Sequence, residues 1–245
     1  MLQTIKEGVL SIGVDESPPP PFHMGDPASQ TFEGFEVDLT NRIAAKLGLK
    51  PLYRSELWSK IFSDLREGRL DMICTAATVT EQRKQVIDFS TPYFDTSVAI
   101  AVRRADQARS VEDLRDRVIG VRIATTAEDV ARQRIEAREF RTFDLNVDAY
   151  HALAEGALDA VIDDYHIARS FQFTIPEIKV AAEIPDTKCQ YAMMFAKGND
   201  ELRIAVNAAL NEMRRDGTYD TSYRKWFAAS GSESVRDRPC EPRFS

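Results

Sequence analysis

The chain of 245 residues is long enough for one large domain or two modest lobes, and its 43% hydrophobic and 29% charged residues are ordinary for a globular protein. A net charge of −7 and a pI near 5.2 argue against a nucleic-acid partner, because phosphates require a basic surface. They also argue mildly against an anionic membrane surface, and no segment approaches the ~18 consecutive apolar residues of a membrane-spanning helix.

The first expected element is a strand over residues 9–14, which begins almost at the start of the chain. The residues before it lack the long apolar core of a secretory signal peptide. Two explanations fit: a cytosolic protein, or a chain whose leader has been removed. We expect the second, because so little sequence precedes the first strand.

Strands and helices alternate through the first third of the chain. Apolar residues recur every fourth position over residues 35–47 and Gly48 follows, which predicts an amphipathic helix that ends there. The pattern then predicts a strand at residues 52–53, a helix from Trp58 to Leu65 and a buried strand over residues 70–74. This βαβαβ order predicts a parallel sheet with helices on its faces.

The second part of the chain repeats this plan. The expected elements are a strand over 118–123, a helix over 126–135, a helix over 148–155 and a strand over 158–162. The segments LREGRLD (65–71) and LAEGALD (153–159) nearly coincide and lie 88 residues apart, each between a helix and a strand. That spacing is too long for a stacked repeat and indicates two lobes of similar topology.

The C-terminal part predicts two helices, over residues 200–216 and 219–227, without strands of their own. Such helices must pack on an existing sheet, and if they return to the first lobe the chain crosses between the lobes twice. We expect the crossings in the extended runs 96–102 and 191–196. We therefore assign residues 1–95 and 194–245 to a discontinuous first lobe and residues 96–193 to the second. A cleft between hinged lobes is where a ligand would bind.

Polar residues follow the expected strands, where ligands bind in open α/β sheets. Thr75, Ala76 and Thr78 come after the third strand, and Thr80 is a suitable N-cap for a short helix that contains Arg83. A cation in a first helical turn opposes the helix dipole, whereas an arginine can grip a carboxylate with two parallel hydrogen bonds. The alternative is a solvated surface arginine beside an acid.

The second lobe and one aromatic residue complete the candidate set. Thr125 and Thr126 open a helix, where free N–H groups and hydroxyls favour anions, although an ordinary N-cap explains them equally. Of Asp163 and Asp164 after the last strand, one can cap a turn and the other can accept hydrogen bonds from an ammonium group. Trp58 offers an aromatic face unless it only packs in the core. Together these groups complement a zwitterion.

The three cysteines are too few for a disulfide framework. Cys74 lies in an apolar strand pattern and is expected to be an inert core residue. A bond between Cys189 and Cys240 would fix the polar C-terminal tail, and it presupposes an oxidising compartment. A reduced pair remains the alternative.

The sequence resembles the periplasmic amino-acid-binding proteins of ABC importers, solute-binding protein family 3. The similarity spans about residues 5–228. Three groups of segments carry it: GFEVDL (34–39); GRLD (68–71) with TEQR (80–83) and FSTPY (89–93); and NAAL (207–210) with DGTY (216–219) and KWF (225–227). The resemblance implies a type II periplasmic-binding-protein fold, in which two hinge strands join two α/β lobes.

The resemblance also implies roles for residues at matching positions. Arg83 would bind the ligand α-carboxylate with help from Thr78 and Thr126, Ala76 would contribute through its backbone, Asp164 would bind the α-ammonium, and Trp58 would stack on the ligand side chain. In a departure from the family pattern, Ala124 replaces the usual glycine before Thr125 and Thr126. The aromatic residue after the first strand is also missing. Glu16 stands in that loop and either meets a cationic ligand group or is a solvated acid.

Three functions remain in competition. The first is an extracytoplasmic, periplasmic solute-binding protein, monomeric and without a cofactor, that delivers an amino acid to an ABC-transporter permease. The second is an enzyme on the same scaffold, such as a cyclohexadienyl dehydratase-like lyase, with an acid such as Glu16 or Asp163 as general acid or base. The third is a ligand-sensing domain cut from a receptor. The three histidines are dispersed and lack metal-ligand spacing, and no nucleophile motif occurs.

Overall fold

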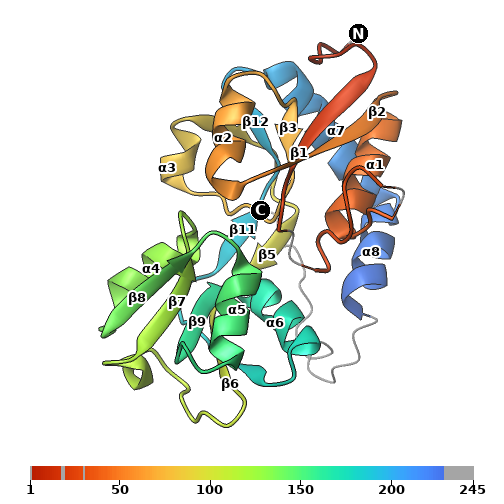
Figure 1. The fold of residues 1–245 in the computed structure, drawn as a ribbon. Helices are drawn as coiled ribbons and strands as arrows, with labels where there is room; N and C mark the ends of the chain where they lie inside the picture. The colour runs from red at the N-terminus through yellow and green to blue at the C-terminus, as the bar shows by residue number, and fades with distance from the viewer. Residues whose placement is uncertain (1, 18–19, 30, 229–245) are drawn as a thin grey trace.

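Two α/β lobes make up the computed structural model, which describes residues 2–17, 20–29 and 31–228 (Figure 1). Its strands form two five-stranded sheets and one two-stranded sheet. Among the described residues, no helix combines the length and the apolar character needed to cross a bilayer. The two-lobed α/β fold predicted from the sequence is confirmed.

The first lobe is built on a mixed sheet in which β1 pairs in parallel with β2 and β3, and β12 runs antiparallel to β3 and β4. In spatial order its strands are β2 (Lys50–Glu56), β1 (Val9–Asp15), β3 (Met72–Ile73), β12 (Met194–Ala196) and β4 (Ile87–Phe89). Its helices are α1 (Phe35–Lys46), α2 (Trp58–Arg66), α3 (Glu81–Lys84), α7 (Asp200–Arg215) and α8 (Thr218–Tyr223), which continues into a π-helical turn, Arg224–Ala228.

The second lobe repeats the arrangement. Strand β7 pairs in parallel with β8 and β9, and β6 runs antiparallel to β9 and β10. In spatial order its strands are β10 (Ile178–Glu183), β6 (Val98–Arg103), β9 (Ala160–Asp164), β7 (Val118–Arg122) and β8 (Glu139–Phe143). Its helices are α4 (Thr126–Arg134), α5 (Asn146–Ala154), α6 (Tyr165–Thr174) and a 3₁₀ turn, Glu112–Leu114.

Two short antiparallel strands, β5 (Phe94–Thr96) and β11 (Cys189–Tyr191), pair with each other between the lobes (Figure 1). The crossings therefore start earlier than the expected runs 96–102 and 191–196. Most of each run already belongs to a lobe, because β6 is a buried strand of the second sheet and β12 a strand of the first. Their apolar residues fill the two cores, so the hinge itself is short.

The C-terminal helices pack on the first lobe. Leu202, Val206, Leu210 and Met213 of α7 share one buried cluster with the apolar face of α1 and with strand β1. The core continues toward the hinge as an aromatic group, in which the ring centroid of Phe94 lies 5.0 Å from those of Phe22 and Phe227 and 4.7 Å from that of His166 on α6. Aromatic rings thus join both lobes behind the cleft.

Two of the cysteines lie among the described residues. Cys74 is fully buried, and burial raises the pKa of its thiol well above the usual value, so this side chain is an inert core residue as predicted. Cys189 lies on β11 with its Sγ 3.8 Å from Thr78 Oγ1. Cys240 lies outside the described residues, and the bond between Cys189 and Cys240 stays a prediction.

Candidate functional site

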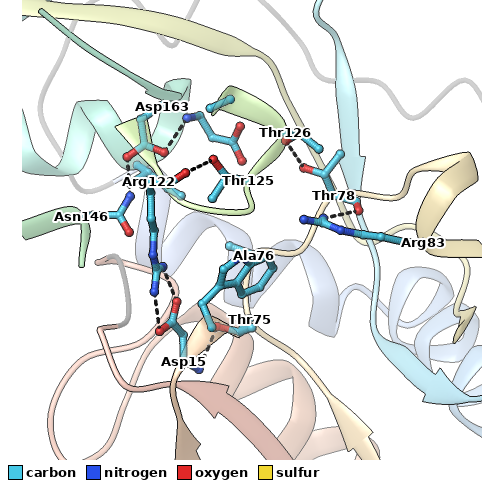
Figure 2. A pocket seen from close by; sticks show the side chains of 14 residues that line it. Asp15, Thr75, Ala76, Thr78, Arg83, Arg122, Thr125, Thr126, Asn146 and Asp163 are labelled. Carbon is cyan, nitrogen blue, oxygen red and sulfur yellow. Dashed lines mark hydrogen bonds and ion pairs between the residues drawn. The ribbon is translucent and has the colours of Figure 1, made fainter. Parts of the chain in front are cut away.

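A pocket lies between the lobes, at the carboxyl ends of the parallel strands (Figure 2). Residues of both lobes line it, and it is partly open to solvent. Eight of the nine predicted site residues line it: Trp58, Thr75, Ala76, Thr78, Arg83, Thr125, Thr126 and Asp164. Asp15, Arg122, Ala127, Asn146, Asp163 and Ile167 line it as well.

Arg83 is fixed at the start of the short helix α3. The Thr80 hydroxyl accepts a hydrogen bond from the Arg83 N–H at 3.1 Å, which is the predicted N-cap. The guanidinium donates to the carbonyl oxygen of Thr78 at 2.8 Å and reaches across the cleft to that of Ala124 at 3.3 Å. Burial lowers its pKa, although an arginine stays charged at any physiological pH. The cleft thus contains one fixed cation from the first lobe.

Trp58 lies between the two arginines of the pocket. Its ring centroid is 5.1 Å from Cζ of Arg83 and 5.8 Å from Cζ of Arg122, both within the range of a cation–π contact. Its Nε1 donates to the carbonyl oxygen of Ala124 at 3.1 Å. The indole is 6% exposed and therefore supports the charged groups while it lines the pocket.

The threonines divide into two sets. Thr125 is the N-cap of α4, where its hydroxyl accepts from the N–H of Glu128 at 3.2 Å and donates to the carbonyl oxygen of Arg122 at 2.8 Å. The Thr126 hydroxyl instead donates to the Thr78 hydroxyl across the cleft at 3.4 Å (Figure 2). Thr125 therefore serves the helix start, whereas Thr126 and Thr78 present hydroxyls from both lobes.

Asp164 is a pocket residue whose carboxylate has an incomplete set of hydrogen bonds. Its Oδ2 accepts from the hydroxyl of Tyr191 at 2.6 Å, but its buried Oδ1 has no hydrogen-bond partner among the described residues. Burial, reinforced by the neighbouring charge of Asp163, raises the pKa of Asp164 to about 7. Its side chain makes no capping bond to α6. A buried carboxylate oxygen that lines a cleft unpaired is suited to accept from an ammonium group.

Asp163 differs from Asp164 because its oxygens are satisfied. Its Oδ2 accepts from Nδ2 of Asn146 at 2.6 Å and from the hydroxyl of Tyr150 at 3.3 Å, and its Oδ1 accepts from the N–H of Asp164 at 2.8 Å. Burial raises the pKa of Asp163 to about 6. These bonds fix the strand end from which Asp164 projects.

Ala76 has a left-handed backbone, with φ of 43°, which an alanine adopts only at a cost. Its N–H donates to the buried Glu36 Oε1 at 2.7 Å, and Glu36 also accepts from the hydroxyl of Tyr93. The other oxygen of Glu36 lies 2.7 Å from Nε2 of His23. Because its N–H is taken, Ala76 can offer its carbonyl oxygen to a ligand. Glu36, which belongs to the segment GFEVDL, thus holds this loop in place through its hydrogen bond to Ala76.

Sequence reasoning missed a buried ion pair that crosses the cleft. Both Nη atoms of Arg122 donate to the carboxylate of Asp15, and the Nη2–Oδ1 distance is 2.9 Å (Figure 2). The two side chains are only 7% and 3% exposed. A usable signal existed, because both charges interrupt strongly apolar strands near their carboxyl ends.

Of the two readings of Glu16, the structure agrees with the solvated acid and not with a ligand contact. Glu16 is exposed and does not line the pocket, whereas the preceding residue, Asp15, is buried and does. Asp15 is the last residue of β1, whereas Glu16 lies in the loop that follows the strand. The acid after the first strand was therefore placed one residue too late.

The histidines lie away from the pocket. His23 is buried beside Glu36, His166 belongs to the aromatic group at the hinge, and His151 is exposed on α5. Among the described residues, no group of three or more His, Cys, Asp and Glu side chains could hold a metal ion. The ionisable groups at the cleft are thus the two arginines and the three aspartates that line it.

Known proteins share both the sequence pattern and the fold. Residues 10–229 match the bacterial extracellular solute-binding proteins, family 3. The L-cystine-binding protein TcyJ of Escherichia coli (strain K12) is 29% identical over 94% of this chain and 86% of its own length. An ancestral arginine-binding protein bound to glutamine is 34% identical, with a TM-score of 0.84 over 91% of this chain and 99% of that one.

A third protein bears on the enzyme alternative. The ancestral amino-acid-binding protein AncCDT-1, a precursor of cyclohexadienyl dehydratase, is 32% identical with a TM-score of 0.81 over 90% of this chain and 95% of its own. The relatives are thus binding proteins, and one of them preceded an enzyme. The match over residues 10–229 covers nearly the whole described chain, and the chain belongs to the bacterial extracellular solute-binding proteins of family 3.

Proposed function

We propose that this protein captures an α-amino acid between its lobes and delivers it to the permease of an ABC transporter. The observation that carries the proposal is the pair formed by Arg83 and the unpartnered Oδ1 of Asp164, which line one pocket from opposite lobes. A guanidinium and a carboxylate so arranged complement the carboxylate and the ammonium of one zwitterion.

The other polar groups fit the same ligand. The hydroxyls of Thr78 and Thr126 meet across the cleft beside Arg83 and can donate to the ligand carboxylate. The carbonyl oxygen of Ala76 can accept from the ammonium group together with Asp164. Thr75 has a supporting role, because its hydroxyl already accepts from the N–H of Asp15 at 3.1 Å.

Closure would couple binding to transport. Several bonds join the lobes directly: Trp58 and Arg83 to the carbonyl oxygen of Ala124, Thr126 to Thr78, and Arg122 to Asp15. A zwitterion held by Arg83 and Asp164 adds contacts that only the closed form offers, so it shifts the population toward closure. We propose that a periplasmic monomer presents this closed form to the permease.

Binding without catalysis is the function we favour, with a lyase on the same scaffold as the second candidate. The raised pKa of Asp163, about 6, is the observation that favours the lyase, because a carboxyl group that holds a proton near neutral pH can act as a general acid. However, both oxygens of Asp163 already accept hydrogen bonds from the protein itself. Incubation with prephenate or arogenate, followed by product analysis, tests this alternative directly.

Calorimetric titration tests the proposed function. The wild type is titrated with the common amino acids and cystine, alongside Arg83→Ala and a control, Arg69→Ala, which removes an arginine paired with Asp64 and Glu67 outside the pocket. We expect saturable binding of at least one amino acid to the wild type and the control, and a loss of at least ~100-fold in affinity in Arg83→Ala. No binding by the folded wild type, or undiminished binding by Arg83→Ala, would contradict the assignment.

A further inference from the structure

Hydrogen bonds on both sides of the cleft hold the Asp15–Arg122 pair in place. Arg122 is held from behind, because its Nε donates to the carbonyl oxygen of Asp144 at 2.9 Å. Asp15 is held by its own N–H, which donates to Thr75 Oγ1 at 3.1 Å. Both side chains are nearly inaccessible to solvent, and a buried ion pair is stable only with good geometry such as this bidentate contact. The two charges are therefore fixed features of the pocket wall.

We propose that Arg122 sets the charge selectivity of the pocket: by neutralising Asp15 it selects amino acids whose side chain has no net charge and offers both a hydrogen-bond donor and an acceptor. This inference rests on the proposed function, because it assigns the ligand side chain after Arg83 and Asp164 have taken the α-carboxylate and α-ammonium groups.

The remaining charges of the pocket support this division. Asp163 is satisfied by Asn146, Tyr150 and the N–H of Asp164, so Asp15 and Arg122 are the charged lining groups left for the ligand side chain. Arg122 also lies close enough to Asp163 to favour its ionised form. One guanidinium thus balances the acids that would otherwise attract a cationic side chain.

A ligand with a charged side chain would have to separate this pair. A guanidinium or ammonium side chain that paired with Asp15 would leave Arg122 buried without its partner. A carboxylate side chain that paired with Arg122 would leave Asp15 buried without its partner. An unpaired buried charge is strongly destabilising. A carboxamide can instead donate to Asp15 and accept from Arg122, and a second α-amino-acid group can offer one charge to each. Both leave the pocket's charges balanced.

The test compares four ligands on the wild type and on reciprocal variants by calorimetry at pH 7.5. L-glutamine and L-cystine supply the carboxamide and the second zwitterion, and L-arginine and L-glutamate supply the net charges. In the wild type we expect at least one neutral ligand to bind ~100-fold or more tightly than either charged one. Arg122→Met, which frees Asp15, is expected to improve the arginine-to-neutral ratio at least ~10-fold, and Asp15→Asn to improve the glutamate-to-neutral ratio similarly.

Arg117→Met is the matched control, because it breaks the ion pair of Arg117 with Asp106 outside the cleft, at 2.7 Å, and should leave the selectivity unchanged. A wild type that binds arginine or glutamate as tightly as the neutral ligands overturns the inference, even if a variant fails to fold. Unchanged ratios in both folded cleft variants also overturn it, while leaving the proposed function intact. If the folded wild type binds no amino acid at all, the proposed function fails and the inference fails with it.

Discussion

The two lobes share a framework and differ where they face each other. In the first, Gly13 on β1 is in register with Ile73 on β3; in the second, Gly120 on β7 is in register with Val161 on β9, 88 residues beyond Ile73. A Cβ on Gly13 would lie 2.6 Å from Cδ1 of Leu70, and a Cβ on Gly120 would lie 2.5 Å from Cδ1 of Leu158, so an added side chain would force the leucine to shift in either lobe. The repeat seen in the sequence is thus a repeat of packing.

A pair of aspartates completes the common framework. Asp71 accepts hydrogen bonds from the N–H groups of Ser11 and Ile5, and Asp159 accepts from that of Val118. Each ties the beginning of one strand to the next. These residues lie at the ends of the strands remote from the cleft, so they maintain the lobes without contributing to the pocket.

At the cleft the two lobes diverge in charge. Two residues after each framework glycine stand Asp15 in the first lobe and Arg122 in the second, and these two pair. At the positions 88 residues apart stand Thr75 and Asp163, then Ala76 and Asp164. The first lobe therefore contributes one acid, Asp15, with Arg83, and the second contributes two acids with Arg122, while threonine hydroxyls come from both lobes. Matching strand ends with complementary charges explain why the lobes together, rather than either alone, form a zwitterion site.

The largest expected effect comes from removing the second lobe's unpaired acid. Asp164→Asn replaces the group proposed to bind the α-ammonium with a neutral amide, and we expect the affinity for the best amino acid to fall by two to three orders of magnitude, roughly 3 to 4 kcal/mol. Calorimetry measures this loss, with the exposed Asp148→Asn on α5 as control. An affinity within a few-fold of the wild type would remove Asp164 from the site.

The same residue predicts a pH dependence of stability. The pKa of Asp164 rises from 3.8 to about 7 on folding, so between these values the native protein holds a proton that the unfolded chain has released. Raising the pH through this window therefore favours unfolding, and the ligand-free protein should lose roughly 4 kcal/mol of stability from this group.

Urea denaturation of wild type and Asp164→Asn from pH 4 to pH 8 measures the effect, because the difference between the two proteins cancels most other titrations. The stability of Asp164→Asn relative to that of the wild type should increase as the pH rises. A difference that stays constant with pH would show that the pKa of Asp164 is not raised.

The smallest effects test the shared framework. Gly13→Ala and Gly120→Ala should each cost roughly 1 to 2 kcal/mol, because the new methyl group meets the leucine opposite. In a double-mutant cycle, Gly120→Ala with Leu158→Ala should be non-additive, since the smaller side chain makes room, whereas Gly13→Ala with Leu158→Ala should be additive across the lobes. Additivity in both cycles would mean that these glycines are not in tight contact with the leucines.

Most of the framework was visible in the sequence because apolar periodicity records burial. Strand β1, helices α1, α2, α4 and α7, and the 88-residue repeat follow from it directly. The pattern missed β8, an edge strand whose residues 139–143 are half-exposed and carry charges, and α6, which begins immediately at Asp164 without a separate turn. Strand β8 lacks the buried face on which prediction relies. Helix α6 has one, with Ile167, Ala168 and Phe171 buried, but it follows the buried strand β9 with no break that marks its start.

Residues at the end of an individual strand could be predicted as site residues, but contacts between the two lobes could not. The rule that ligands lie beyond strand ends brought out Arg83, Thr78 and Asp164, all of which line the pocket. It could not show that Asp15 and Arg122 meet, because 107 residues separate them and their contact depends on how the lobes close. The left-handed Ala124, with φ of 59°, explains why a glycine is usual there, yet only the structure shows that its carbonyl accepts from both Trp58 and Arg83.

A crystal structure of the protein with the amino acid that it binds most tightly would show whether Arg83 and Asp164 hold the ligand as proposed. We expect a closed cleft with the ligand α-carboxylate within hydrogen-bond distance of the Arg83 guanidinium, its ammonium group on Oδ1 of Asp164, and its side chain directed at an intact Asp15–Arg122 pair. A ligand bound outside this pocket, or one whose carboxylate and ammonium groups contact neither Arg83 nor Asp164, would contradict this expectation.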